Sequence, residues 1–305
     1  MNLVDLAEAA KSNDYKWAAL PFYKNGAPFE GGTLQGQNAS QDQNARPLWG
    51  MTLKAAGPMR FRWNEQNPNR DKFLSGLCER CGGKQVVPLE LIHSKIVYDV
   101  KEAGDAFNKQ GDGIVTQNAA LVPVVTVADC VPIYFYDSKT GAFGVAHSGW
   151  KGTGIAGDVI ALMKKNYGSD PRDILAAIGP HIHDCCYTVD AERAQYFIDN
   201  FDGACVRELP QDNKAAQAQN ADSPGLFGQE QNFALSLLRA NLNVLEAAGV
   251  LEENIVAAKN CTACDDRFGS FRREAAALDV PAQEKARLFT TQAAFVIMEN
   301  AEVNR

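Results

Sequence analysis

The stretch from Leu121 to Gly154, LVPVVTVADCVPIYFYDSKTGAFGVAHSGWKGTG, decides the fold. It contains three short apolar runs, at 121–127, 131–136 and 142–147, and each predicts a buried strand because β-branched and aromatic residues dominate it. The turn-forming residues 137–141 predict a hairpin between the second and third strands. A hairpin that turns at 138–140 pairs residues whose numbers sum to roughly 278. This register predicts Cys130 opposite His147 or Ser148.

The hairpin therefore brings a thiol and an imidazole together at the end of a sheet. Such a pair is typical of two ligands of a borderline metal such as zinc, or of a nucleophile with its base. A small buried cysteine packed beside a core histidine is the third interpretation. The segment Gly149-Trp-Lys-Gly152 favours a binding site, since its two glycines let the backbone approach a ligand closely.

Composition limits the classes of function. The chain has 305 residues, 46% of them apolar and 22% charged, with a net charge of −7. These values are typical of a soluble globular protein and argue against a nucleic-acid partner, since no basic patch stands out. No apolar run reaches the length of a membrane-spanning helix, and the N-terminus has no signal-peptide pattern. We therefore expect no membrane partner, a cytoplasmic location and eight reduced cysteines.

The order of helical and strand patterns predicts the fold class. Strands and helices alternate irregularly, which indicates an α+β fold with layered mixed sheets in a single domain. Residues 1–60 carry few patterns and are predicted to be an irregular N-terminal extension, followed by the main domain at 61–305. The polar stretch near 209–231 is predicted to be an insertion. Helical spacing predicts helices at 67–82, 154–167 and 233–248.

Histidine is scarce, which limits the metal chemistry. The chain has four: His93, His147, His181 and His183. A multicopper cluster needs more imidazoles, whereas a single blue-copper site stays open by count. A catalytic zinc site needs three protein ligands and one open position, a count that His93, Cys130 and His147 meet. For the His181-x-His183 pair we favour a polar loop.

The remaining cysteines give weaker indications. The pairs Cys78/Cys81 and Cys261/Cys264 allow a four-cysteine zinc site, but the distance between the pairs exceeds that of zinc ribbons. Neither pair lies clearly at a strand-to-helix junction, where a thioredoxin-type pair would be. Cys185 and Cys186 are adjacent, so in a strand they point to opposite sides, and core packing is favoured over shared metal binding.

Three cationic side chains are candidates for binding an anionic substrate group. Arg272, in Phe271-Arg-Arg273, has the planar guanidinium that suits phosphate oxygens. The alternative interpretation is that Arg272 and Arg273 are solvent-exposed basic residues in a connection between two strands. Arg70 and Lys151 are weaker candidates of the same kind, and Trp150 is a candidate contact because it adjoins His147.

Several segments over about residues 60–300 resemble, in order, the motifs of one known family. Ala128-Asp-Cys-Val-Pro132 resembles its ADC-x-P, and Ala146-His-Ser-Gly-Trp-Lys-Gly152 resembles its AHAGWRG. This is the YfiH-like, laccase-domain family, which includes purine nucleoside phosphorylases and peptidoglycan editing factors. The other similar segments are Asn69-Arg70, Leu91-Ile-His-Ser94, Gly111-Asp-Gly113, Ile178-Gly-Pro with Cys185-Cys-Tyr187, and Cys261-Thr262 with Phe268-Gly-Ser-Phe-Arg-Arg273.

The resemblance implies a layered α+β fold and a zinc ion bound by two histidines and one cysteine. The matching positions here are His93, Cys130 and His147. It also implies phosphorolysis of adenosine, guanosine, inosine and methylthioadenosine, together with deamination of adenosine. Zinc is therefore favoured over copper, and the implied partners are a purine nucleoside and phosphate. The chain differs from the family motifs at Leu91, Ser94, Lys151, Thr188, Ser236 and Thr291.

Three functional hypotheses stay open. The first is a zinc-dependent enzyme for purine nucleosides. The second is an amidase-type hydrolase for peptidoglycan precursors, with Cys130 as nucleophile and His147 as base. The third is a non-enzymatic binding protein on the same fold. For the first, we expect His93, Cys130 and His147 to converge at a concave spot lined by Trp150 and Phe271, with His181 and His183 outside it.

Overall fold

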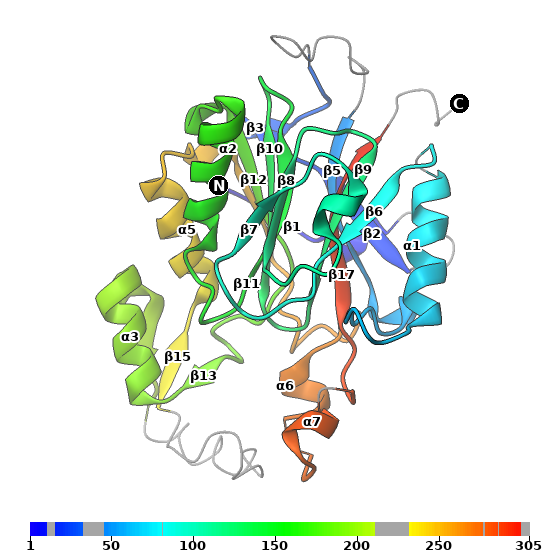
Figure 1. Cartoon of the computed structure of the whole chain (residues 1–305). Coiled ribbons are helices and arrows are strands. Elements are labelled where there is room, and N and C mark those ends of the chain that lie inside the picture. Colours follow the sequence, from blue (N-terminus) through cyan, green and yellow to red (C-terminus); the bar gives the residue numbers. More distant parts are fainter. Residues whose placement is uncertain are drawn as a thin grey trace.

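The computed structural model describes residues 1–10, 16–32, 46–80, 82–210, 232–276, 278–285 and 287–299. Two large β-sheets lie face to face at the centre, and helices cover their outer faces (Figure 1). The predicted α+β class, with layered mixed sheets and helices in a single domain, is confirmed. The predicted insertion near 209–231 falls almost entirely outside the described residues, as does Cys81.

The first large sheet has seven strands in the order β1-β16-β12-β10-β11-β8-β7. Its central hairpin, β10–β11, is the one that the residues around 131–148 predict. Along the chain the strands are β1 (Asn2–Val4), β7 (Val97–Asp99), β8 (Gly113–Thr116), β10 (Val131–Asp137), β11 (Phe143–Ser148), β12 (Ile174–Ile178) and β16 (Ile255–Ala258).

The second large sheet has five strands in the order β2-β5-β17-β9-β6. Two of them, together with β1 of the other sheet, come from residues 1–60, which the sequence predicts to be irregular. This part of the chain therefore contributes paired strands to both sheets. The strands are β2 (Trp17–Pro21), β5 (Arg46–Thr52), β6 (Gln85–Pro88), β9 (Leu121–Val127) and β17 (Gln292–Glu299).

Alternation along the strands divides the apolar side chains between separate cores. On β10, Tyr134 and Tyr136 face the five-stranded sheet, where Trp49 packs against Tyr134 at 5.3 Å between ring centroids. Ile133 and Phe135 face the opposite way, toward α2 and α5. A third core lies between α1 and the outer face of the five-stranded sheet. Because β10 buries both faces, it reads as a continuous apolar run.

Six labelled helices surround the sheets. None of the helices in the described residues is both long and apolar enough to span a lipid bilayer. The helices are α1 (Pro68–Arg80), α2 (Ile155–Tyr167), α3 (Ala191–Phe201), α5 (Leu237–Ala247), α6 (Phe271–Glu274) and α7 (Ala282–Lys285).

Two predicted details are wrong. In the central hairpin, Pro132 pairs with His147 and Val131 with Ser148, so the numbers sum to 279 and Cys130 lies just beyond the ladder. The loop has four residues and ends at Gly141, whose φ of 73° closes it. The predicted helix at 233–248 begins only at Leu237, because Ser236 caps it and 233–235 form a strand.

That strand belongs to a small antiparallel sheet beside α3, with the order β13-β15-β14. The Leu209 amide donates to the carbonyl of Asn232 at 2.8 Å, so the two ends of the predicted insertion lie side by side. The strands are β13 (Thr188–Val189), β14 (Val206–Glu208) and β15 (Phe233–Leu235), and a separate hairpin joins β3 (Tyr23–Lys24) to β4 (Ala27–Pro28).

Candidate metal centre

Cys130 lies where the chain crosses from the five-stranded sheet to the seven-stranded sheet, between β9 and β10. The preceding residue, Asp129, has a φ of 72° and is buried. Its carboxylate accepts hydrogen bonds from the Thr262 hydroxyl and from the Arg272 backbone amide, both at 2.7 Å. These bonds fix the crossover, and with it the thiol, against two segments that are distant in sequence.

Asp112 holds the two histidines of the candidate centre. Its Oδ1 accepts from Nδ1 of His147 at 2.8 Å and from the backbone amide of His93 at 3.1 Å. Its Oδ2 accepts from the amide and the hydroxyl of Ser94, both at 2.6 Å. His93 has a φ of 58°, a conformation that these bonds stabilise. Because Nδ1 of His147 donates to Asp112, Nε2 remains available to a metal.

The three predicted ligands converge as expected. The ligand atoms of His93, Cys130 and His147 all lie within 4.8 Å of one another. Gly149 closes one side: a Cβ built there would lie 3.1 Å from Cδ2 of His93, 3.3 Å from Sγ of Cys130 and 3.5 Å from Cε1 of His147. Two imidazoles and a thiol are donors that suit zinc, with bonds of roughly 2.0–2.3 Å. The residues present therefore fit such an ion.

The electrostatics of the group favour a thiolate. Burial would raise the pKa of Cys130, but the neighbouring His147 and His93 lower it to about 6. Burial would likewise lower the pKa of His147, but Cys130 and Asp112 raise it to about 9. Burial would raise the pKa of Asp112, but the hydrogen bonds with His147 and Ser94 outweigh this effect and hold the pKa below its usual range. The thiolate is the form of cysteine that binds metals and attacks electrophiles.

The other residues predicted to contact substrate or line the centre make contacts within the chain. Arg70 is buried on α1, where it bonds Asp71 and the carbonyl of Arg60. Nζ of Lys151 lies 5.3 Å from the ring centre of Trp150. Phe271 packs edge-on against Phe289. Roles for Arg70, Lys151, Trp150 and Phe271 in binding substrate stay predictions.

Arg272 is positioned beside the crossover. Its Nη1 donates to the Thr188 hydroxyl at 3.1 Å, and its guanidinium lies 5.8 Å from the ring centre of Tyr187. Burial lowers the pKa of Arg272, and the guanidinium of Arg193 adds to this effect. Burial raises the pKa of Tyr187, and the charge of Cys130 raises it further. A hydrogen bond with Arg193 acts in the opposite direction. Tyr187, Arg193 and Arg272 thus form one group near Cys130.

Sequence reasoning missed two of these residues as functional candidates. Asp112 lies in the Gly111-Asp-Gly113 segment, for which the sequence indicated only a similarity to a family motif. The signal that could have revealed Asp112 as a functional residue is its position between two glycines, directly before a strand. Arg193 gave no signal, because a basic residue in the first turn of a helix is ordinary. Its Nε is buried and has no hydrogen-bond partner within the described part of the chain.

The remaining histidines and cysteines lie outside this group. The rings of His181 and His183 lie 4.6 Å apart between centroids and are tilted to each other, and burial lowers the pKa of His181 to about 3. His181 is buried, so the expected polar loop is wrong for it, although its predicted place outside the centre is confirmed. Cys185 and Cys186 form a second group with Cys261 and Cys264. The prediction that this adjacent pair packs into the core is therefore wrong.

Comparison with known proteins identifies the family. A family described as "Multi-copper polyphenol oxidoreductase laccase" matches residues 66–278, which is more than half of the chain. The chain belongs to this laccase-domain family. The resemblance seen in the sequence motifs is thereby confirmed.

Named relatives of this laccase-domain chain are purine enzymes. "Purine nucleoside phosphorylase YlmD" of Bacillus subtilis is 36% identical over 260 residues, 70% of this chain and 87% of the relative. The protein of the same name in Geobacillus stearothermophilus is 38% identical over 166 residues, 53% of this chain and 55% of the relative, so the match spans about half of that protein. "Adenosine deaminase RL5", from an unknown prokaryotic organism, is 35% identical and matches over 56% of its length.

Solved structures share the fold. A Bacillus licheniformis hypothetical protein, YfiH, superposes with a TM-score of 0.67 at 24% identity, covering 83% of this chain and 93% of its own. YlmD from Geobacillus stearothermophilus superposes with a TM-score of 0.65 at 25% identity, covering 88% and 99%. These likenesses agree with the α+β fold of the laccase-domain chain.

Three positions at which the chain differs from the family motifs have structural partners. The Ser94 hydroxyl donates to Asp112 behind the candidate centre. The Thr188 hydroxyl accepts from Arg272. The Ser236 hydroxyl accepts from the Arg239 amide and caps α5. The side chains that differ from the family at these positions are therefore part of the hydrogen bonding of this chain.

Proposed function

We propose that this laccase-domain chain is a zinc-dependent enzyme that acts on purine nucleosides. The observation that carries the proposal is the convergence of His93, Cys130 and His147, with Asp112 bonded to the outer nitrogen of His147. Relatives named purine nucleoside phosphorylase and adenosine deaminase supply the substrate class and the two reactions. The proposed substrates are adenosine, guanosine, inosine and methylthioadenosine.

The imidazoles of His93 and His147 and the thiolate of Cys130 would hold the ion. Neighbouring residues set the orientation and the protonation of these three ligands. The chemistry that zinc supplies when bound is Lewis acidity and a lowered pKa, about 7, for a water at its open position. Asp112 fixes the ring orientation and tautomer of His147 by accepting its Nδ1 proton. Gly149 lets the backbone pass close to the three ligands, at a position where a Cβ would crowd them.

The phosphate needed for phosphorolysis would bind at Arg193 and Arg272. The guanidiniums of Arg193 and Arg272 lie near each other, and Nε of Arg193 is buried without a hydrogen-bond partner among the described residues, which favours an anion between the two. The Arg193 guanidinium also lies over the ring of Trp150, 4.4 Å from its centre, and this contact helps to hold the guanidinium in place. Phosphate would displace the purine from the ribose, so that the glycosidic C–N bond breaks and a C–O bond forms.

A nucleoside panel tests the proposal. The zinc-loaded protein is incubated with each of the four nucleosides, with and without phosphate, and the products are separated by chromatography. We expect adenine and ribose 1-phosphate from adenosine only when phosphate is present, and inosine with ammonia in either case. Absence of turnover of every nucleoside by zinc-loaded protein would refute the proposal and favour a binding protein on this fold.

Replacing Arg193 by alanine is expected to raise the KM for phosphate roughly tenfold, the low end of the cost of a lost charge-assisted hydrogen bond. Deamination of adenosine, which needs no phosphate, should be nearly unchanged. Initial rates at varied phosphate measure the first effect, and inosine formation measures the second. Arg172→Ala, which removes an exposed arginine that pairs with Asp170, is the matched control. An unchanged KM in Arg193→Ala would contradict this phosphate site.

Replacing Gly149 by alanine is expected to lower zinc affinity roughly tenfold, since overpacking costs about 1–3 kcal/mol. The added methyl group would crowd both imidazoles and the thiol at 3.1–3.5 Å. Competition with a coloured chelator measures the affinity. Gly157→Ala on α2 is the control, because a Cβ there meets only Val244, at 3.7 Å. Equal zinc affinity in the two variants would argue against a metal beside Gly149.

The second candidate function is Cys-dependent hydrolysis, with Cys130 as nucleophile. The observation that favours it is the lowered pKa of this thiol beside His147. The two functions differ in the fate of the sulfur, because a thiolate bound to zinc reacts slowly with alkylating reagents. Rapid labelling of Cys130 by iodoacetamide in zinc-loaded protein would favour the hydrolase. Protection of Cys130 by zinc would favour the nucleoside enzyme.

A further inference from the structure

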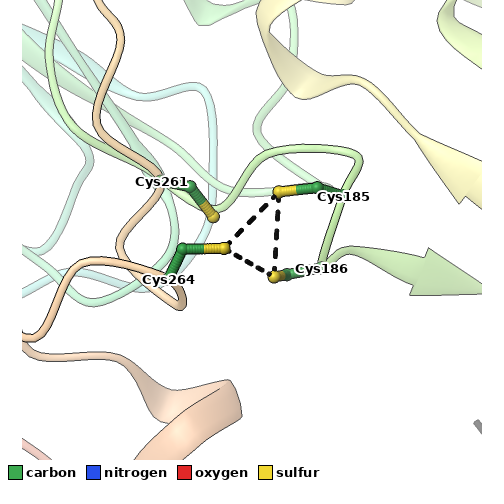
Figure 2. Close-up of side chains that lie close together, drawn as sticks. All are labelled: Cys185, Cys186, Cys261 and Cys264. Atoms are coloured by element: carbon green, nitrogen blue, oxygen red, sulfur yellow. Dashed lines mark hydrogen bonds between the residues drawn. The ribbon is translucent and has the colours of Figure 1, made fainter.

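Four cysteines gather at a second place, between the segment that precedes β13 and the loop that follows β16. They are Cys185 and Cys186 on one side, and Cys261 and Cys264 on the other (Figure 2). We infer that these four thiolates bind a single zinc or iron ion in a tetrahedral site. The inference concerns a different part of the molecule from the proposed catalytic centre and does not depend on it.

Two of the sulfur–sulfur distances equal the edge of a tetrahedral metal site, and a third is shorter. With metal–sulfur bonds of roughly 2.3 Å, the edges of a sulfur tetrahedron are about 3.8 Å long. The Sγ of Cys185 lies 3.8 Å from that of Cys186 and 3.7 Å from that of Cys264, and the Cys186–Cys264 distance is 3.2 Å. All four sulfurs lie within 4.8 Å of one another. Tetrahedral S4 coordination is typical of zinc and of iron.

Tight turns present the sulfurs in this way. The Cys264 amide donates to the Cys261 carbonyl at 3.1 Å, which folds the Cys-x-x-Cys segment so that both thiols face one side. The Cys186 amide donates to the carbonyl of His183 at 2.9 Å, so the adjacent cysteines lie in a turn, not in a strand. Sequence alternation therefore does not separate their side chains, and Figure 2 shows all four sulfurs turned toward one point.

Contacts around the sulfurs support a preformed site. The His183 backbone amide donates to Sγ of Cys261 at 3.4 Å, a bond that orients the sulfur. The Arg273 guanidinium donates to the carbonyls of Thr262, Ala263 and Asp265, and so holds the Cys261–Cys264 turn in shape. A cavity of about 540 Å³ adjoins Cys261 and Cys264, which gives an ion access from solvent.

Core packing does not explain the group, because Cys185 and Cys264 are exposed and Cys186 is half-buried. Disulfide pairing would use two sulfurs at a time and would give no reason for four to converge. A group of four thiols is instead typical of a metal site, in which the bound ion replaces the protons of the thiols. The described residues contain one other metal-ligand group, that of His93, Cys130 and His147.

The ion would join two segments that carry residues of the candidate centre. Tyr187 and Thr188 directly follow Cys186, and the hydroxyl of Thr188 accepts from Arg272. Thr262, between Cys261 and Cys264, donates to Asp129 beside Cys130. The four-cysteine site would therefore hold these two segments together behind the centre, in a structural role.

Metal content tests the site without relying on activity. The His147→Ala protein, which lacks the first centre, should contain about one zinc or iron per chain by elemental analysis, and the wild type about two. Adding Cys264→Ser to His147→Ala should remove the remaining metal. Adding Cys205→Ser instead should not, because Cys205 is a buried cysteine outside both groups. His147→Ala protein without bound zinc or iron, after purification with both metals supplied, would overturn the inference.

A second measurement guards against a variant that fails to fold. Cobalt added to metal-depleted wild type should give the visible absorption of tetrahedral cobalt thiolate, and this band should persist in His147→Ala. Alkylation with mass spectrometry should find Cys185, Cys186, Cys261 and Cys264 protected until a chelator is added. Rapid alkylation of these thiols in metal-supplied protein, or a disulfide among them, would contradict the site.

Discussion

Replacing His147 by alanine is expected to remove the ion shared with His93 and Cys130, and to lower turnover of adenosine by at least about 1,000-fold, a loss typical for removal of an essential catalytic group. The imidazole is buried at the end of β11, and the described residues place only His93 and Cys130 with it in the group. Two ligands would remain, and one of them, Cys130, would lose the larger of the two histidine effects that lower its pKa. Chromatography of the products and elemental analysis measure the two effects.

The matched control is His183→Ala. It removes an imidazole that is partly buried and lies outside the group. It should retain the metal of the centre and most of the activity. Full turnover of adenosine by His147→Ala protein that lacks this metal would show that the proposed zinc enzyme is wrong.

Replacing Asp112 by asparagine is expected to lower zinc affinity by roughly 100-fold, the upper end of the effects seen when the outer partner of a metal-bound histidine is lost. An amide cannot accept from His147 and Ser94 on both of its atoms, so one buried donor loses its acceptor. The tautomer with the proton on Nε2, which cannot bind zinc, then becomes competitive. Chelator competition measures the affinity.

Asp137→Asn is a suitable control for this change, because Asp137 is also a buried carboxylate that accepts backbone amides, in the turn after β10. Its zinc affinity should equal that of the wild type. If Asp112→Asn bound zinc as tightly as Asp137→Asn, the role assigned to Asp112 would be contradicted.

The central part of the fold could be predicted because its strands bury both faces. The run at 121–127 has the observed bounds of β9, since continuous apolar residues between turns leave few alternatives. The meeting of Cys130 and His147 could also be predicted, because a hairpin brings residues at its open end together. His93 lies outside this hairpin, between β6 and β7, and its place was predicted from the ligand count and the family resemblance. The exact register could not, since it depends on whether the loop has three or four residues.

What the sequence did not reveal depends on pairing between distant segments. The strands β1, β2 and β5 are short or interrupted by Gly50 and Pro47, so only their partners in the two sheets define them. The four-cysteine group joins residues that lie more than 70 positions apart, and no local pattern indicates that two turns meet. Arg193 gained its place in the same way, because the fold brings α3 beside Trp150 and Arg272.

The central claim is that one zinc ion binds between His93, Cys130 and His147. Anomalous diffraction from crystals grown with zinc, recorded on both sides of the zinc absorption edge, tests it most directly. We expect an edge-dependent peak at roughly 2.3 Å from Sγ of Cys130 and 2.0–2.1 Å from one nitrogen of each imidazole. Crystals that show no such peak among these three residues, at full zinc occupancy elsewhere, would contradict it.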